Sequence, residues 1–326
     1  MIYSRYLHSL LLGFLLASII FIAAVFFQIG APIESSRWLY ETYTIKNQIA
    51  QSIKTPKLAV ISGSNAIFGM SCKTIQQQTK VPCFNGGTNG ALGTDYLFKR
   101  ARPWLKPGDI VLLPLEYEFY TYQKIPNDAY LSYVLARDPQ HLYSVDFLTQ
   151  FRFITGVSFE RLRLGILAKL HTPELGNANY QSKNLNEYGD ETSNLKNETT
   201  KEQLTKVSKE QPMTIIKGNI ESTYGMNMIR DFTYWCQQNN ITVLATWPNT
   251  IKFEVYSGQS QQAFFQSIEQ FYKKLGVPVL GKPEEFMYEK SMIYDTSYHL
   301  NDQGVSQRTQ QTIKLLEPYL KNMPKI

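Results

Sequence analysis

The sequence predicts an α/β protein in which a parallel sheet carries helices on both faces, a three-layer, doubly wound arrangement. Short apolar runs alternate with segments of helical periodicity along most of the chain, which is typical of parallel strands joined by helices. The run that begins at Ile110 is almost continuously apolar, as expected for a strand buried on both faces. At 326 residues the chain can hold one large domain with insertions or two smaller ones.

The N-terminal segment differs in kind, because residues 9–30 carry no charged side chain. This run is long enough to cross the roughly 30 Å hydrocarbon core of a membrane as a helix. We predict an uncleaved transmembrane anchor there, behind a short cytoplasmic N-terminus of residues 1–8. A cleaved signal peptide is the alternative, although its apolar region usually covers only about 7–15 residues. Arg5 favours a cytoplasmic N-terminus, which leaves the bulk of the chain in the periplasm or outside the cell.

Residues 31–55 predict an amphipathic linker helix, since apolar residues recur every three or four positions behind a Ser cap. Residues 56–326 are expected to form the α/β domain. Its first elements are predicted, in order, as a strand over 58–61, a helix over 66–79, a strand over 83–85, a helix over 94–105 and a strand after the turn at 107–108.

An insertion at about 120–220 interrupts this alternation. Residues 127–171 are aromatic and helical in pattern, and form either packing helices or a lid or surface against the membrane, with Arg152, Arg161 and Arg163 near lipid headgroups. Residues 176–211 are mostly polar and predict a flexible segment, because they bury too little apolar surface to offset their ordering entropy. The alternation then resumes with a helix over 224–239, a strand over 242–248, a helix over 260–275, a strand over 277–281 and a helix from Asn301.

Several classes of site and partner find no support in the composition. The net charge of +6 is spread along the chain without a dense Lys/Arg stripe, so nucleic acid is not an expected partner. The four scattered histidines do not match a zinc set, and residues 85–93 lack the Gly-Lys-Ser/Thr ending of a phosphate loop, so neither a metal nor a cofactor is expected. Cys72 and Cys83 either pair in an oxidising compartment, leaving Cys236 unpaired, or all three are small buried apolar residues.

The stretch "LAVISGSNAIFGMS", residues 58–71, places Ser64 directly behind an apolar strand. Ser, Gly and Asn are ordinary residues of a strand-to-helix turn. Alternatively, Ser64 is a nucleophile at the carboxyl end of the strand, where open parallel sheets bind their ligands. The "NGGTNG" segment, residues 85–90, and the pair Glu116 and Tyr117 are expected at the same edge.

An acyl-transfer site also needs an imidazole and a carboxylate that orients it. His299 is the candidate by elimination, because His8 adjoins the apolar run and His141 and His171 lie in the insertion. Asp295 stands four residues before His299 and can reach its Nδ1 atom within a loop. Alone, an Asp and a His before a helix are more often caps and surface groups; together with Ser64 they predict a catalytic triad.

The segments "VISGSNAIFGMS", "FNGGTNG" and "DTSYHLNDQG", in this order, resemble the blocks of the SGNH (GDSL-like) hydrolase superfamily over residues 56–315, apart from the insertion. The chain looks most like membrane-anchored members that accompany cell-envelope polysaccharide assembly, including alginate acetylation and teichoic-acid alanylation. The resemblance implies that Ser64 is the nucleophile and that its own backbone N–H is one oxyanion donor. Gly90 matches the second donor, with Gly87 as the alternative, and a glycine allows the close approach of backbone to substrate.

Two positions depart from the family pattern. Glu116 stands near the Asn whose side chain donates to the oxyanion, and an ionised carboxylate cannot donate. Tyr117 or Asn89 is the expected donor in its place, and Glu116, Tyr117 and Asn65 are candidates for substrate binding. The last block also has the spacing Asp-x-x-x-His instead of Asp-x-x-His.

The resemblance implies a serine esterase or O-acyltransferase of the inner membrane that acts on O-acyl groups, acetyl first among them, of an extracytoplasmic glycan. Its expected partners are the glycan or acylated sugar, the bilayer through the N-terminal helix, and a membrane acyltransferase. The alternative, favoured by Glu116, is a non-catalytic glycan-binding or assembly factor with the same fold.

Overall fold

The computed structural model describes residues 2–171, 180–213 and 222–325 of the chain. The chain divides into two compact units. The first unit comprises Met1–Tyr40 and Ile125–Gln181, and the second comprises Glu41–Lys124 and Ser182–Ile326. The alternation of strands and helices lies in the second unit.

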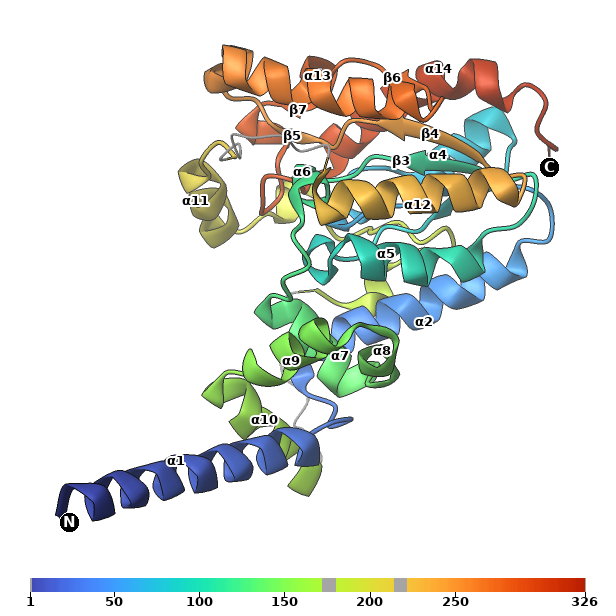
Figure 1. The fold of residues 1–326 in the computed structure, drawn as a ribbon. Coiled ribbons are helices and arrows are strands. Elements are labelled where there is room, and N and C mark those ends of the chain that lie inside the picture. Colours follow the sequence, from blue (N-terminus) through green and yellow to red (C-terminus); the bar gives the residue numbers. More distant parts are fainter. Residues whose placement is uncertain (1, 172–179, 214–221, 326) are drawn as a thin grey trace. The chain divides into compact units, whose positions relative to one another are not determined.

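The described part of the second unit contains a five-stranded sheet in which every neighbouring pair is parallel. Its strand order is β2-β1-β3-β4-β6 (Figure 1). The strands are β1 (Leu58–Val60), β2 (Cys83–Asn85), β3 (Ile110–Leu113), β4 (Thr242–Thr246) and β6 (Val279–Leu280). In register, Val60 pairs with Asn85 on one side and with Leu112 on the other. The predicted α/β class with a parallel sheet is therefore confirmed.

Helices lie on both faces of this sheet (Figure 1), with α5, α12 and α13 on one face and α4 and α14, which pack against each other, on the other. The helices of this sheet region are α4 (Cys72–Thr79), α5 (Thr94–Ala101), α12 (Tyr224–Gln238), α13 (Gln259–Lys274) and α14 (Asp302–Leu320). All residues of β1 and β3 are buried, which explains why these strands are continuously apolar in the sequence. The core cluster includes Leu58, Leu112 and Leu244 from neighbouring strands.

The helix predicted over 66–79 is instead two helices, α3 (Ser64–Ile67) and α4. The chain turns at Gly69, where a side chain would collide with the carbonyl oxygen of Asn65. Ser71 then starts α4 as its N-cap, since its Oγ accepts the N–H of Thr74 at 3.1 Å. Ser64 therefore begins a single helical turn and not a long helix.

Cys72 and Cys83 form a disulfide, and Cys236 is a buried free thiol. The disulfide joins the start of α4 to the start of β2. Of the two alternatives that the sequence leaves open, the structure shows the pairing. Burial raises the pKa of the Cys236 thiol to about 12, so this cysteine stays protonated.

The strand predicted after residue 108 ends at Leu113, earlier than its apolar pattern suggests. Pro114 has no N–H for the ladder, and the residues that follow form helix α6 (Tyr117–Thr121), in which Tyr117, Phe119 and Tyr120 are buried. The helix predicted over 94–105 ends at Ala101 and continues as a 3-10 turn, Arg102–Trp104, around Pro103. A short parallel pair, β5 (Thr250–Ile251) and β7 (Met287–Tyr288), is missed by the sequence pattern.

The prediction of a flexible segment over 176–211 is wrong for residues 180–211, and residues 176–179 lie outside the described residues. This stretch contains helix α11 (Lys201–Lys209) and several buried polar residues. The Asp190 carboxylate accepts the N–H groups of Cys72 at 2.8 Å and Lys73 at 3.0 Å. Asn194 Nδ2 donates to the Leu300 carbonyl at 2.6 Å. Hydrogen bonds to the backbone of the sheet region thus replace the apolar burial that the composition lacks.

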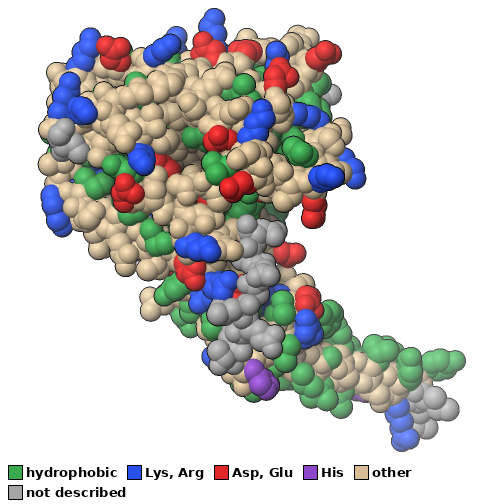
Figure 2. All heavy atoms as spheres, turned by 180° about the vertical axis from the view of Figure 1, so that it is seen from behind, with side chains coloured by type: hydrophobic (Ala, Val, Ile, Leu, Met, Phe, Trp, Pro, Cys, Tyr) green, Lys and Arg blue, Asp and Glu red, His purple; other side chains and the backbone are tan. Residues whose placement is uncertain are grey.

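The first unit holds a long N-terminal helix, α1 (Ile2–Phe27). Within it, Tyr3–Phe27 is the one helix of the described chain that is long and apolar enough to cross a membrane. Figure 2 shows hydrophobic side chains covering this helix. Helix α1 begins at Ile2, before the charge-free residues 9–30, because the residues around Arg5 and His8 are also helical. Length and composition support the predicted span but do not fix its orientation.

The linker helix predicted over 31–55 is present as a 3-10 turn, Glu34–Ser36, followed by α2 (Arg37–Ser52). The helical pattern of residues 127–171 corresponds to four helices of the first unit. These are α7 (Asp128–Arg137), α8 (Gln140–Ser144), α9 (Phe147–Thr155) and α10 (Phe159–Leu170).

Candidate active site

The loops that follow β1 and β2 touch at the carboxyl edge of the sheet. A Cβ atom built on Gly63 would lie 2.6 Å from the backbone nitrogen of Gly90, a distance that no side chain tolerates. Glycine is therefore required at position 63 by the close approach of the two backbones. As a result, Ser64 and Gly90 belong to one small region of the second unit.

Ser64 is the first residue of α3 and is half-buried, whereas Asn65, Ala66 and Ile67 behind it are buried. Its position at the carboxyl end of β1 is the one that the sequence predicts. A serine that is only half-buried at this point can meet a substrate. Turn chemistry alone also explains a serine here, so the nucleophile remains a prediction.

His299 and Asp295 are hydrogen-bonded, with 2.6 Å between Nδ1 and Oδ1, and both are buried. Their loop closes on itself, since the His299 N–H donates to the Thr296 carbonyl at 3.0 Å and the Tyr294 N–H donates to the His299 carbonyl at 2.8 Å. This turn accommodates the extra residue of the Asp-x-x-x-His spacing. Because an ionised carboxylate only accepts, Nδ1 is the donor in this hydrogen bond.

The imidazole lies beside the helical turn that Ser64 begins. The His299 ring stacks on Phe68 with 4.2 Å between ring centroids and 19° between planes. The Phe68 N–H donates to the Ser64 carbonyl at 3.0 Å, and the Leu300 N–H donates to the Phe68 carbonyl at 3.2 Å. Ser64 and Phe68 are one turn apart, and residues with this spacing share a helix face. The structure thus brings the His299 loop to the helix that carries Ser64.

Glu116 joins the loop after β3 to the loop after β1, and it is 3% exposed. Its Oε2 atom lies 2.7 Å from Ser62 Oγ and accepts the Gly63 N–H at 3.0 Å. Its Oε1 atom accepts the Asn65 N–H at 3.0 Å. All three contacts are on the segment that contains Ser64, so Glu116 fixes the conformation of that segment.

Asn65 is fully buried, and both the nitrogen and the oxygen of its side-chain amide are hydrogen-bonded to protein groups. Its Nδ2 donates to the Pro114 carbonyl at 2.7 Å, and its Oδ1 accepts from Arg308 Nη2 at 3.0 Å.

Arg308 lies on α14 and is also fully buried. Its Nη1 donates to the Asn65 carbonyl at 2.8 Å and also to Asn249 Oδ1. Burial lowers the pKa of Arg308 to about 10, against the attraction of Tyr288, Glu116 and Tyr117, so it stays charged at neutral pH.

The sequence analysis does not single out Arg308, because an arginine inside a helical pattern resembles a surface residue. A signal was nevertheless present. Gly304, Arg308 and Thr312 recur every four residues on the buried face of α14. An arginine on the inward stripe of an amphipathic helix predicts a buried partner.

The remaining candidates lie around this centre. Asn89 Oδ1 accepts the Ala91 N–H at 2.8 Å and caps the 3-10 turn Gly90–Leu92. Tyr117 is buried against Phe264 and Phe265. Burial raises its pKa well above the ordinary value, so its phenol is neutral and can donate a hydrogen bond. Gly87 packs against the end of α3, where a Cβ would lie 2.6 Å from the Ile67 nitrogen. Their roles toward a substrate stay predictions.

A second glutamate, which the sequence analysis does not consider, joins α6 to the His299 loop. Glu118 Oε2 accepts from the Tyr298 hydroxyl at 2.8 Å. Within the described residues, no group of three His, Cys, Asp or Glu side chains has an arrangement that could hold a metal ion.

Comparison of the chain with protein-family models finds no match. Comparison with curated proteins finds no similar sequence. The three short motifs are therefore the basis of the SGNH resemblance.

Proposed function

We propose that this chain is an SGNH-type serine esterase or O-acyltransferase, anchored in a membrane, that acts on O-acyl groups of an extracytoplasmic glycan. The observation that carries the proposal is the Asp295–His299 pair, which stacks on Phe68 one helical turn from Ser64. A buried imidazole oriented by a carboxylate, next to a half-exposed serine, is the arrangement that nucleophilic acyl transfer requires.

In the proposed reaction, His299 Nε2 takes the proton of Ser64 Oγ as this oxygen attacks the ester carbonyl. The tetrahedral oxyanion accepts hydrogen bonds from the backbone N–H groups of Ser64 and Gly90. The intermediate collapses as His299 returns the proton to the departing sugar oxygen, which leaves an acyl group on Ser64. Water or a second sugar hydroxyl then attacks the acyl-enzyme, again with His299 as base, and Ser64 is regenerated. Asp295 stabilises the imidazolium that forms in each step.

The topology of the second unit supports a doubly wound fold for this chemistry. Counted along the chain, the five sheet strands follow the order 2-1-3-4-5, which is the order of flavodoxin-like doubly wound sheets. Such folds bind ligands where the strand order reverses, between the first and third strands. Here Gly63 follows β1 and Glu116 follows β3, so the candidate site lies at this reversal.

Two further observations support an extracytoplasmic, membrane-bound enzyme. Tyr3–Phe27 has the length and composition of a membrane span, and the Cys72–Cys83 disulfide is typical of oxidising compartments. Anchoring suits a polymer substrate or a membrane-bound acyl donor, because tethering raises the local concentration of enzyme. The glycan itself is inferred from the family resemblance.

The experiment that tests this proposal measures hydrolysis of p-nitrophenyl acetate by purified protein. Ser64→Ala should lower the rate by about a thousandfold or more, because the nucleophile is lost. It should change Tm by less than about 2 °C, because Ser64 is only half-buried. Ser257→Ala, at an exposed serine, is the matched control and should keep full activity. Undiminished hydrolysis by Ser64→Ala would rule out the nucleophile.

The second candidate function is a non-catalytic glycan-binding or assembly factor, and one observation favours it. A Cβ atom built on Gly90 would lie 3.5 Å from Glu116 Oε1, so a carboxylate stands close to the proposed oxyanion donor. A negative charge there weakens oxyanion stabilisation. This function predicts that the wild-type protein hydrolyses no ester, yet binds an acetylated envelope polysaccharide equally well with and without Ser64→Ala, as measured by calorimetry.

A further inference from the structure

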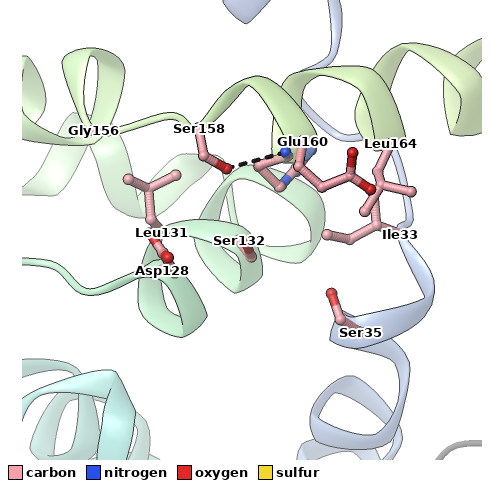
Figure 3. A pocket seen from close by; sticks show the side chains of 10 residues that line it. Ile33, Ser35, Asp128, Leu131, Ser132, Gly156, Ser158, Glu160 and Leu164 are labelled. Carbon is pink, nitrogen blue, oxygen red and sulfur yellow. Dashed lines mark hydrogen bonds between the residues drawn. The ribbon is translucent and has the colours of Figure 1, made fainter.

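We propose that a pocket in the first unit binds the phosphate group of a membrane phospholipid, with Arg161 as the cation that receives it. The pocket has a volume of about 160 Å³. It is formed by α7, by α10 and by the segment before α2, from which Ser35 points toward α10 in Figure 3. Its lining residues are Ile33, Ser35, Asp128, Leu131, Ser132, Gly156, Ser158, Glu160, Arg161 and Leu164.

Arg161 is 5% exposed, and its guanidinium is only partly satisfied by protein groups. Nη1 donates to Gln28 Oε1. Nε and Nη2 are buried and have no hydrogen-bond partner among the residues that the structure describes. Gly165, one turn later, leaves the space for this side chain, because a Cβ there would collide with both Gln28 and Arg161.

Burying two N–H donors of one guanidinium without acceptors costs free energy. Burial lowers the pKa of Arg161 to about 10, so the group is a cation at neutral pH. Adjacent N–H groups of a guanidinium match two oxygens of a phosphate, which binds them as a bidentate pair. The hydroxyls of Ser35, Ser132 and Ser158 in the lining can donate to the remaining oxygens.

The lining also contains two carboxylates, Glu160 and Asp128, whose charge would oppose an anion. Glu160 is held by Arg163 through two hydrogen bonds of 2.7 and 2.8 Å, so its charge is already compensated. Asp128 is exposed in the first turn of α7, where water screens it. Neither carboxylate accepts a hydrogen bond from Arg161 Nε or Nη2.

The position of the pocket within the first unit favours a lipid over free phosphate. Gln28 directly follows α1, the helix that can cross a membrane. Phe159 at the start of α10 contacts Phe21 of α1, with ring centroids 6.4 Å apart, and Lys169 Nζ donates to the Ile29 carbonyl at 3.3 Å. With α1 in a bilayer, α10 lies at the level of the headgroups.

The helices next to the pocket carry apolar side chains that face solvent and suit acyl chains. Exposed apolar residues of α9 and α10 are Phe147, Leu148, Phe151, Phe159, Leu164, Leu167 and Leu170. Leu164 belongs to both the lining and this exposed set. The proposal rests on α1 as a membrane helix and is independent of the chemistry at Ser64.

The test uses the full chain, delipidated in a non-ionic detergent, and native mass spectrometry with added lipid. Dioleoylphosphatidylglycerol should form a one-to-one complex. Dioleoylglycerol, with the same chains and no phosphate, should not, and inorganic phosphate at the same concentration should not displace the phospholipid. Equal retention of dioleoylglycerol would overturn the phosphate assignment, and equally tight binding of inorganic phosphate would overturn the lipid assignment.

Two matched variants remove one positive charge each from α10. Arg161→Gln should weaken phosphatidylglycerol binding by about tenfold or more, whereas Lys169→Gln should change it by less than about twofold, because Lys169 is exposed and lies outside the pocket lining. Equal weakening by both would contradict the proposal. If circular dichroism shows that Arg161→Gln is unfolded, Ser132→Leu fills the pocket while keeping Arg161; retained binding in that variant would also contradict it.

Discussion

Glu116 uses both carboxylate oxygens on the segment that carries Ser64, and Arg308 contacts the same segment through Asn65. The side chains around the candidate nucleophile are therefore held by buried charges and amides and not by apolar packing alone. Such groups give a loop one defined conformation, because each donor and acceptor has a directional partner. An active-site serine benefits from this rigidity.

Glu116→Gln tests this role at the residue scale. The amide replaces one acceptor oxygen by an NH₂ group, which faces a backbone or hydroxyl donor at Ser62, Gly63 or Asn65. We expect a loss of about 1–3 kcal/mol in the free energy of unfolding and at least about a tenfold loss of ester hydrolysis. Urea denaturation and p-nitrophenyl acetate turnover measure the two effects.

Glu118→Gln is the matched control, because an amide oxygen can still accept from the Tyr298 hydroxyl. Its free energy of unfolding should change by less than about 0.5 kcal/mol. If Glu116→Gln is as stable and as active as the control, Glu116 does not hold the Ser64 segment.

At this scale the sequence identifies residues whose partners are near in the chain. Asp295 and His299 are four residues apart, and their hydrogen bond follows from spacing and elimination. The partners of Asn65 and Arg308 are a carbonyl and an amide from other loops. No local pattern encodes such contacts, because they depend on which loops the fold brings together.

Among the elements, the polar segment 180–211 and α2 are tied to the sheet by buried polar groups. Lys46 on α2 is fully buried, and its Nζ donates to the carbonyl oxygens of Asn85 at 2.6 Å and Gly189 at 2.9 Å. Burial lowers the pKa of Lys46 to about 7, although Asp190 and Glu191 oppose the shift. A composition-based prediction of flexibility misses such bonds, because it counts only apolar residues.

This lysine predicts a pH-dependent stability. The folded-state pKa is depressed below the ordinary 10.5, so the unfolded chain binds the proton more tightly between about pH 7 and 10.5. The free energy of unfolding should therefore rise with pH in this window, by up to about 1.4 kcal/mol per pH unit from this group. Lys46→Met should flatten that slope, as measured by urea denaturation at several pH values.

Lys54→Met, at an exposed lysine just past the end of α2, is the control and should keep the wild-type slope. Identical slopes in the wild type and Lys46→Met would show that the buried amine does not titrate in this range.

For the whole molecule, the alternation of apolar and helical segments predicts the parallel sheet, but it cannot fix where strands end. Strand β3 ends at Leu113, before Pro114, and the apolar residues that follow are the buried side chains of a helix. Apolar runs of this length suit either a buried strand or a buried helix. The pair β5 and β7 escapes prediction because each strand has only two residues.

The proposed orientation of the chain follows from Arg5 and from the disulfide, and it can be measured directly. Alkaline phosphatase, which is active only outside the cytoplasm, should be active when fused after residue 40. The same reporter fused before residue 1 should be inactive, which provides the control. Activity only in the N-terminal fusion would reverse the orientation and the envelope assignment.

A serine-reactive fluorophosphonate probe gives the most direct measurement of the proposed chemistry. The wild-type protein should be labelled, Ser64→Ala should not, and His299→Ala should be labelled at least about tenfold more slowly because the base is missing. His171→Ala, at an exposed histidine, should label at the wild-type rate. Folded wild-type protein that takes up no probe, or Ser64→Ala that takes up as much as the wild type, would contradict a serine nucleophile at this site.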